Sequence, residues 1–370
     1  MRIFHCDHCD HLVFFENTTC VRCGHLLAFL PDLGEMGSLE PVDDTRWRSP
    51  LAGGATYRLC QNYREQNVCN WALTDADPHE RCLSCRLTRL VPDLGRQGHR
   101  EAWYRLEVAK RRLVYTLLAL QLPIVDRDDD PAGGLAFEFV ADPDDPSQPP
   151  AITGHEHGVI RISIAEADDS ERERRRASLH EPYRTPLGHV RHEIGHYYWE
   201  RLIASSAYRL ETFRAVFGDE REDYAAALQR HYAEGPPADW TSRFVSAYAS
   251  AHAWEDWAET WAHYLHITDT VDTAAACGVS IRPGRRNEPT LKSLPPDTAA
   301  PTTPFEQMMA AWYSLTYVLN NLNRGLGLPD GYPFVLSPAA VDKLRVVHEV
   351  IAGAQNPAMA ATVEYDKFKL

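Results

Sequence analysis

The sequence predicts an α+β fold in which a small cysteine-rich module precedes a mostly helical domain with a small sheet. Eight of the nine cysteines lie within residues 1–95, whereas helical patterns of apolar residues dominate the rest of the chain and strand patterns are few. The 370 residues, 44% hydrophobic and 24% charged, have the composition of a soluble globular protein with room for two domains. We therefore predict domains at residues 1–95 and 96–355 and a C-terminal tail at residues 356–370.

The charge and hydropathy of the chain indicate which classes of partner and which cell compartment to expect. The formal net charge of −14 makes nucleic acid an unlikely main partner. Residues 1–95 alone hold 13 acidic residues against 9 arginines and no lysine, whereas modules that bind nucleic acid are normally basic. Neither an apolar run fit for a signal peptide nor a stretch of about 18 apolar residues occurs. We expect a cytoplasmic protein without membrane association.

The first four cysteines have the spacing of a zinc ribbon. Cys6 and Cys9 form one CxxC pair, and Cys20 and Cys23 form a second pair after ten intervening residues. Each pair makes a tight turn that presents two thiolates, and two such pairs complete a tetrahedral metal site. These residues, the first quartet, are predicted to hold a structural zinc ion.

A second quartet follows, consisting of Cys60, Cys69, Cys82 and Cys85, of which only the last two form a CxxC pair. Disulfides are the alternative, but the cytosol disfavours them. A redox-active CxxC pair would lie in a βαβ pattern, which is missing from this part of the sequence. We predict that the second quartet holds a second structural zinc ion. The alternative, in which one zinc ion is bound by one CxxC pair from each quartet, stays open. Protein docking or substrate presentation is the expected role of the module.

Residues 96–122 predict a long helix with an apolar stripe at steps of three and four residues. Lys110 interrupts the stripe, so we expect its aliphatic stem to pack while its amine reaches water. Arg111 and Arg112 are expected on the solvated face. Strands are then predicted at residues 135–140 and 158–164, the second because apolar and polar side chains alternate along it.

Residues 192–196 have the sequence His-Glu-Ile-Gly-His on a helix for which Thr185 is the predicted N-cap. Positions four apart share one face of a helix, so His192 and His196 can direct two imidazoles at one zinc ion. Glu193 lies next to them, where it can take a proton from a zinc-activated water. The alternative is a solvated helix face with two ordinary histidines.

A further helix is predicted at residues 248–264, with Glu255 and Glu259 on one face. Two carboxylates four residues apart repel each other on a bare helix, which favours a functional pairing. Glu255 as third ligand completes a His₂Glu site with an open fourth position, typical of a catalytic zinc. Glu259 would then hold the far nitrogen of His192. If Glu255 is not the ligand, His252 or Glu259 is the next candidate.

The motif HEIGH followed on a later helix by ExxAE resembles the gluzincin metallopeptidases, in which a glutamate is the third zinc ligand. This resemblance implies the ligand role for Glu255 and the histidine-orienting role for Glu259. In the similar lethal-factor-like branch, a tyrosine seven residues before the ligand stabilises the oxyanion, and Tyr248 occupies that position. The whole chain, with cysteine pairs in front and EDWAETWAHY behind HEIGHYYW, resembles bacterial zinc-binding metallopeptidases with an N-terminal zinc ribbon.

The resemblance implies a zincin-like domain that hydrolyses peptide bonds in a protein or peptide substrate, with Glu193 as general base. It implies one catalytic zinc ion beside the two structural ones. Zincin folds pair an extended substrate with an edge strand above the active-site helix, and residues 158–164 are our candidate for that strand, with a plain core strand as the equal alternative. The competing function is a non-catalytic protein-interaction module with a vestigial or closed HExxH site. A peptidase of DNA-bound proteins is a third option, which the acidic charge disfavours.

The segment between His196 and Glu255 is 58 residues long and contains a predicted extra helix at residues 223–233, which we expect to wall one side of a cleft. We expect Cys277 to be a buried structural cysteine and His263 to lie on a helix surface. The remaining predicted elements are helices at residues 165–179, 305–322 and 338–351 and a long surface loop at residues 283–304.

Overall fold

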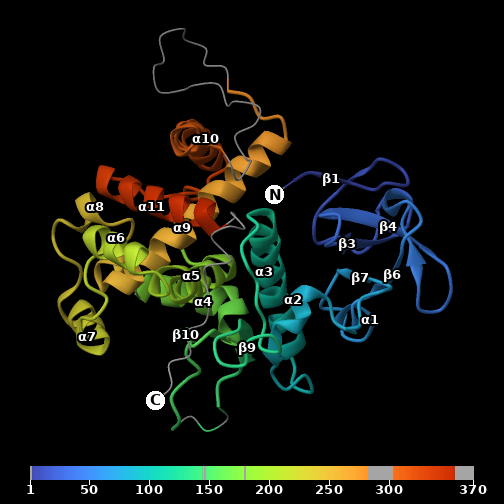
Figure 1. Cartoon of the computed structure of the whole chain (residues 1–370), viewed down its shortest axis with the longest axis horizontal. Coiled ribbons are helices and arrows are strands. Elements are labelled where there is room, and N and C mark those ends of the chain that lie inside the picture. Colours follow the sequence, from blue (N-terminus) through green and yellow to red (C-terminus); the bar gives the residue numbers. More distant parts are fainter. Residues whose placement is uncertain (1, 144, 146, 179–180, 282–302, 355–370) are drawn as a thin grey trace.

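The computed structural model describes residues 2–143, 145, 147–178, 181–281 and 303–354. A strand-rich N-terminal region is followed by a mostly helical region, which confirms the predicted α+β class (Figure 1). The elements of the first region are β1 (Phe4–His5), β2 (Leu12–Val13), β3 (Leu26–Leu30), β4 (Glu35–Pro41), β5 (Trp47–Arg48), β6 (Thr56–Leu59), α1 (Gln61–Arg64), β7 (Ala72–Thr74), α2 (Leu83–Arg86) and β8 (Thr88–Leu90).

The second region is built from helices around a small sheet. Its elements are α3 (His99–Ala119), β9 (Ala136–Val140), β10 (Gly154–Glu156), β11 (Val159–Ser163), α4 (Asp169–Ser178), α5 (Pro186–Tyr198), α6 (Ala207–Phe217), α7 (Tyr224–Glu234), α8 (Trp240–Arg243), α9 (Ala253–Ala276), α10 (Phe305–Gly325) and α11 (Pro338–Ala354). Within the described residues, no helix is both long and apolar enough to cross a membrane.

Three sheets are present among the described residues. β1 and β2 form a hairpin, and β3 to β7 form a five-stranded antiparallel sheet in chain order. The third sheet has the order β10-β11-β9-β8, in which β8 and β11 each run parallel to β9. Because β8 precedes residue 95 in the chain, this sheet joins the N-terminal region to the helical one.

The prediction that residues 158–164 form an edge strand is wrong. This segment forms β11, which lies inside the sheet between β10 and β9. The edge strand next to β11 is β10, a short strand that pairs antiparallel with β11 across a turn at His157 and Gly158. Ile160 and Ile162 of β11 are buried. The three residues of β10 show no apolar alternation, so the sequence pattern did not reveal this strand.

Helix α3 lies between the strand-rich region and the other helices (Figure 1). The predicted exposure of Lys110 is wrong, since its side chain is fully buried, lies 2.9 Å from Glu107 and bonds Thr88. The predicted exposure of Arg111 is also wrong, since it is buried and donates a hydrogen bond to the carbonyl oxygen of Val68. Thr88 and Val68, both in the N-terminal region, bond these two side chains, so neither cation reaches water.

An aromatic cluster joins α3 to the N-terminal region. The ring of Tyr115 lies 5.4 Å from that of Phe15 and 5.7 Å from that of Phe29. Trp71 lies 4.7 Å from Phe29 on the other side. Such aromatic pairs contribute about 0.5–1.5 kcal/mol each beyond the area they bury. One continuous hydrophobic core therefore runs from β1 to α11 through this cluster.

Two single-residue predictions in the helical region are wrong. Cys277 is exposed, because it follows the last turn of α9, where the chain leaves the core. His263 is buried rather than on a helix surface, and its Nδ1 lies 2.6 Å from the hydroxyl of Tyr332, which covers it. Most of the loop predicted at residues 283–304 and all of the tail predicted at residues 356–370 lie outside the described residues.

Candidate active site and metal centres

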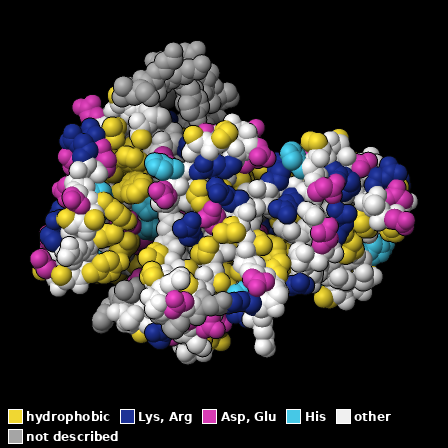
Figure 2. Space-filling model, turned by 90° about the horizontal axis from the view of Figure 1, so that it is seen from below, with side chains coloured by type: hydrophobic (Ala, Val, Ile, Leu, Met, Phe, Trp, Pro, Cys, Tyr) yellow, Lys and Arg dark blue, Asp and Glu magenta, His cyan; other side chains and the backbone are white. Residues whose placement is uncertain are grey.

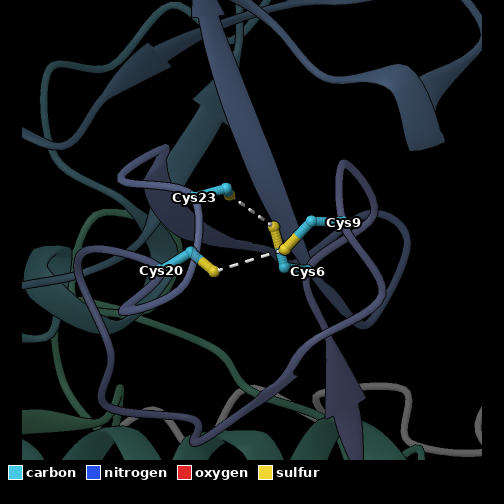
Figure 3. A group of neighbouring side chains, drawn as sticks. All are labelled: Cys6, Cys9, Cys20 and Cys23. Carbon is cyan, nitrogen blue, oxygen red and sulfur yellow. Dashed lines mark hydrogen bonds between the residues drawn. The ribbon is translucent and has the colours of Figure 1, made fainter.

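The four sulfurs of the first quartet converge from two knuckles, one after β1 and one before β3 (Figure 3). The sulfur of Cys6 lies 3.7 Å from that of Cys23, and the sulfur of Cys9 lies 3.7 Å from that of Cys20. Zinc binds thiolates at about 2.3 Å, which places the sulfurs of a tetrahedral site about 3.8 Å apart. The geometry of this quartet therefore fits a zinc ion.

The four sulfurs of the second quartet also converge, and all four cysteines are buried. The sulfurs of Cys69 and Cys82 are 3.8 Å apart, and all four sulfurs lie within 4.8 Å of one another. The structure thus groups the cysteines in chain order, without the exchange of pairs that the sequence left open. None of the eight cysteines, all of them within the described residues, forms a disulfide.

Arg111 of α3 supplies a buried positive charge beside the second quartet. Its pKa is raised, since the opposing effect of burial is outweighed by Cys69, Glu107, Cys85 and Cys82. Glu107 is already paired with a lysine of the same helix. A zinc ion bound by four thiolates has a net charge of −2, so Arg111 would provide a counter-charge if the quartet held zinc.

Helix α5 carries the two histidines of the HExxH motif. The predicted N-cap is confirmed, because the Thr185 hydroxyl accepts a hydrogen bond from the amide of Gly188 at 3.0 Å. One turn apart on the helix, His192 and His196 bring their Nε2 atoms to 3.2 Å. Burial lowers the pKa of His196 to about 3. For His192, in contrast, the effect of burial is outweighed by Glu255 and Glu259, which raise its pKa well above its usual range. A bound metal would require both imidazoles to be neutral.

Glu255 completes a three-residue cluster with these histidines. Its Oε2 lies 3.0 Å from Nε2 of His192, and its Oε1 lies 3.6 Å from Nε2 of His196. Donor atoms bound tetrahedrally to zinc at about 2.0–2.1 Å lie about 3.3 Å from one another. Oε2 is also buried without a hydrogen-bond partner. The donor set and its spacing therefore fit a zinc ion with a position left for water.

The ligand helix begins later than the sequence predicted. α9 starts at Ala253, and Tyr248 lies before it in a short 3₁₀ turn, Tyr248–Ser250. His252 is the N-cap, since its Nδ1 accepts a hydrogen bond from the amide of Trp254 at 3.1 Å. Both ring nitrogens of His252 are thus bonded to backbone groups, and the structure brings Glu255 to the two histidines instead.

Two further carboxylates lie at this centre. Glu259 Oε1 is 2.7 Å from Nδ1 of His192, and its other oxygen accepts a hydrogen bond from the hydroxyl of Ser246 at 2.6 Å. Hydrogen bonds of this kind fix the tautomer and orientation of a ligating histidine. Glu193 is 8% exposed, and burial raises its pKa to about 7. Ser246 is a site residue that the sequence did not reveal.

Helices α5 and α9 touch at Gly195. A Cβ atom at this position would lie 2.9 Å from Cα of Ala258 and 3.1 Å from Cβ of Trp261. The carbonyl oxygen of Gly195 accepts a hydrogen bond from the indole of Trp257 at 2.9 Å. The glycine inside HEIGH thus permits the close approach that places Glu255 against the two histidines.

Aromatic side chains surround the cluster. The ring of Tyr248 lies 6.0 Å from that of His192, and the ring of Trp254 lies 4.4 Å from that of His196. Tyr224 of α7 donates a hydrogen bond to Glu255 at 2.7 Å, a contact that the sequence did not predict. Figure 2, which views the molecule from below, shows hydrophobic side chains gathered on the α7 side next to a hollow with histidine side chains.

Comparison with known proteins agrees with this arrangement. The family model "Putative zinc-binding metallo-peptidase" matches residues 99–350, and a zinc-ribbon domain model matches residues 3–96. Uncharacterized proteins of Mycobacterium bovis and Mycobacterium tuberculosis are each 44% identical over 351 residues, which cover 95% of this chain and 95% of theirs. No solved structure matches the chain. The chain belongs to the zinc-binding metallo-peptidase family and carries its zinc ribbon at the N-terminus.

Proposed function

We propose that the protein is a zinc-dependent peptidase of the gluzincin type, with His192, His196 and Glu255 as the ligands of the catalytic metal. The observation that supports this most strongly is the convergence of three donor atoms at tetrahedral spacing beside a buried glutamate. Three protein ligands leave one position for water, as catalytic zinc sites require. Each cysteine quartet, in this proposal, holds one structural zinc ion.

Three side chains have separate roles in the proposed reaction. Zinc, when bound, would lower the pKa of a water to about 7 and polarise the scissile carbonyl. Glu193 accepts the proton of the attacking water and transfers it to the leaving amine. The hydroxyl of Tyr248 donates a hydrogen bond to the oxyanion that develops on the carbonyl oxygen. Glu259 keeps His192 in the tautomer that directs Nε2 at the metal.

Strand β10 supplies a surface for an extended substrate. It is one of the two edge strands of its sheet, and the ring of its residue His155 lies 6.1 Å from that of His196. A peptide that pairs with such an edge gains main-chain hydrogen bonds regardless of its sequence. We propose a protein or peptide substrate that binds along β10 and passes the cluster on α5, which packs against this strand.

A peptide-library digest tests this function. The zinc-loaded full chain is incubated with a mixed peptide library, and new termini are mapped by mass spectrometry. We expect defined cleavage sites that disappear with 1,10-phenanthroline and return when zinc is added. A library left intact by a chain that holds three zinc ions would contradict the proposal. In that event, a protein-interaction module with a closed third site would be the better description.

A further inference from the structure

The 58-residue segment between His196 and Glu255 returns to the proposed metal centre at the start of α7. We propose that Tyr224, the first residue of this helix, is a positioning residue that holds one oxygen of Glu255 and leaves the other for the metal. The inference rests on the zinc centre of the proposed function. It gives the inserted helix a role in metal coordination, beyond the cleft wall that the sequence predicted.

The two carboxylate oxygens of Glu255 have different surroundings. Oε1 accepts a hydrogen bond from the Tyr224 hydroxyl at 2.7 Å. Oε2 has no hydrogen-bond partner and lies 3.0 Å from Nε2 of His192. The residue is only 1% exposed, so water does not satisfy Oε1 in place of the tyrosine. The carboxylate is therefore set for binding through a single oxygen, which suits a four-coordinate zinc.

A second contact ties α7 to the start of the ligand helix. Because Nδ1 of His252 accepts a hydrogen bond from the Trp254 amide, the ring proton is on Nε2. Nε2 then donates to the carbonyl oxygen of Glu222 at 3.2 Å, two residues before Tyr224. The rings of Tyr224 and His252 also meet edge to face with centroids 5.3 Å apart. The two helix starts are thus clamped together around Glu255.

The start of α7 is itself well defined. The side chain of Asp223 caps the helix by accepting a hydrogen bond from the amide of Ala226 at 3.0 Å. This cap fixes the backbone from which Tyr224 projects. Removal of the Tyr224 hydroxyl would leave Oε1 buried and unsatisfied, and the carboxylate would be free to turn both oxygens toward the metal. Loss of such a supporting hydrogen bond typically weakens metal binding about 10–100-fold.

The test compares Tyr224→Phe with Tyr208→Phe in the full chain. Phenylalanine keeps the ring and removes only the hydroxyl, so the fold is preserved. Tyr208 lies on α6, is 79% exposed and serves as the matched control. Zinc affinity is measured by chelator competition, and kcat and KM are measured separately at saturating zinc. We expect about 10–100-fold weaker binding at one of three sites in Tyr224→Phe, and parental affinity in the control.

The possible outcomes separate this inference from the proposed function. Weakening confined to the site that His192→Ala also removes, with kcat largely restored at saturating zinc, supports the positioning role. A Tyr224→Phe chain that binds three zinc ions as tightly as the parent overturns the inference and leaves the proposed function intact. A parent chain that binds no third zinc ion overturns both.

Discussion

Replacement of Glu193 by glutamine is expected to lower kcat/KM by about 10³-fold while the zinc content stays at the parental value. Glutamine has nearly the same shape but accepts no proton at neutral pH, so the attacking water loses its base. The side chain is buried beside the donor cluster and is not one of the three donors, so the metal keeps its ligands. Cleavage of the best library peptide and zinc per chain are measured on the same preparation.

The matched control is Glu173→Gln on α4, whose side chain is 64% exposed and paired with Arg176 on the surface. This variant is expected to cleave at the parental rate. A Glu193→Gln chain that cleaves as fast as the parent would show that another group removes the proton from the attacking water. Loss of zinc together with activity would instead show that Glu193 supports the metal, which the proposed mechanism does not allow.

Replacement of Arg111 by methionine is expected to destabilise the folded chain by about 3–5 kcal/mol and to speed the loss of one zinc ion. The guanidinium is the buried cation beside Cys69, Cys82 and Cys85, and its removal leaves the charge of the zinc–thiolate group uncompensated. Methionine fills most of the volume, so the effect reports charge more than packing. Urea unfolding and the rate of zinc transfer to a chromogenic chelator measure the two effects.

Arg112→Met provides the control for this prediction. Arg112 is the next residue on α3, its side chain is 36% exposed, and it pairs with Glu16 at 2.6 Å. A partly exposed ion pair of this kind contributes less than about 1 kcal/mol. Equal destabilisation by both variants would mean that Arg111 contributes only packing or its hydrogen bond to Val68. The account of a counter-charge for the second quartet would then be wrong.

Local spacing was sufficient to identify the histidine pair and the first quartet, whose side chains the structure brings together as donor clusters. His192 and His196 are four apart on one helix, and the pairs of the first quartet are each made by one turn, so their geometry is set within a few residues. Glu255 was named from its pairing with Glu259 on one helix face, with His252 and Glu259 as alternatives, because it reaches the histidines across a helix contact that spacing does not show. That contact depends on Gly195, whose missing side chain gives no pattern of its own.

Residues that depend on tertiary packing escaped prediction. Tyr224 and Ser246 lie on segments whose sequence contains no metal-ligand pattern, and only the fold brings them to Glu255 and Glu259. Lys110 was expected to pack its stem and extend its amine to water, because it interrupts an apolar stripe and lysines there usually reach the solvent. The N-terminal region covers a second face of α3, and the buried pairing of this lysine with carboxylate and hydroxyl offsets the desolvation.

Zinc content per chain, measured on the parent and on His192→Ala, tests the central claim most directly. The His192 imidazole is one of three donors in the third cluster and touches neither cysteine quartet. We predict three zinc ions in the parent and two in the variant, with both quartets still loaded. Two zinc ions in both chains would contradict the account, because the HEIGH helix would then hold no metal and Glu193 would have no activated water to deprotonate.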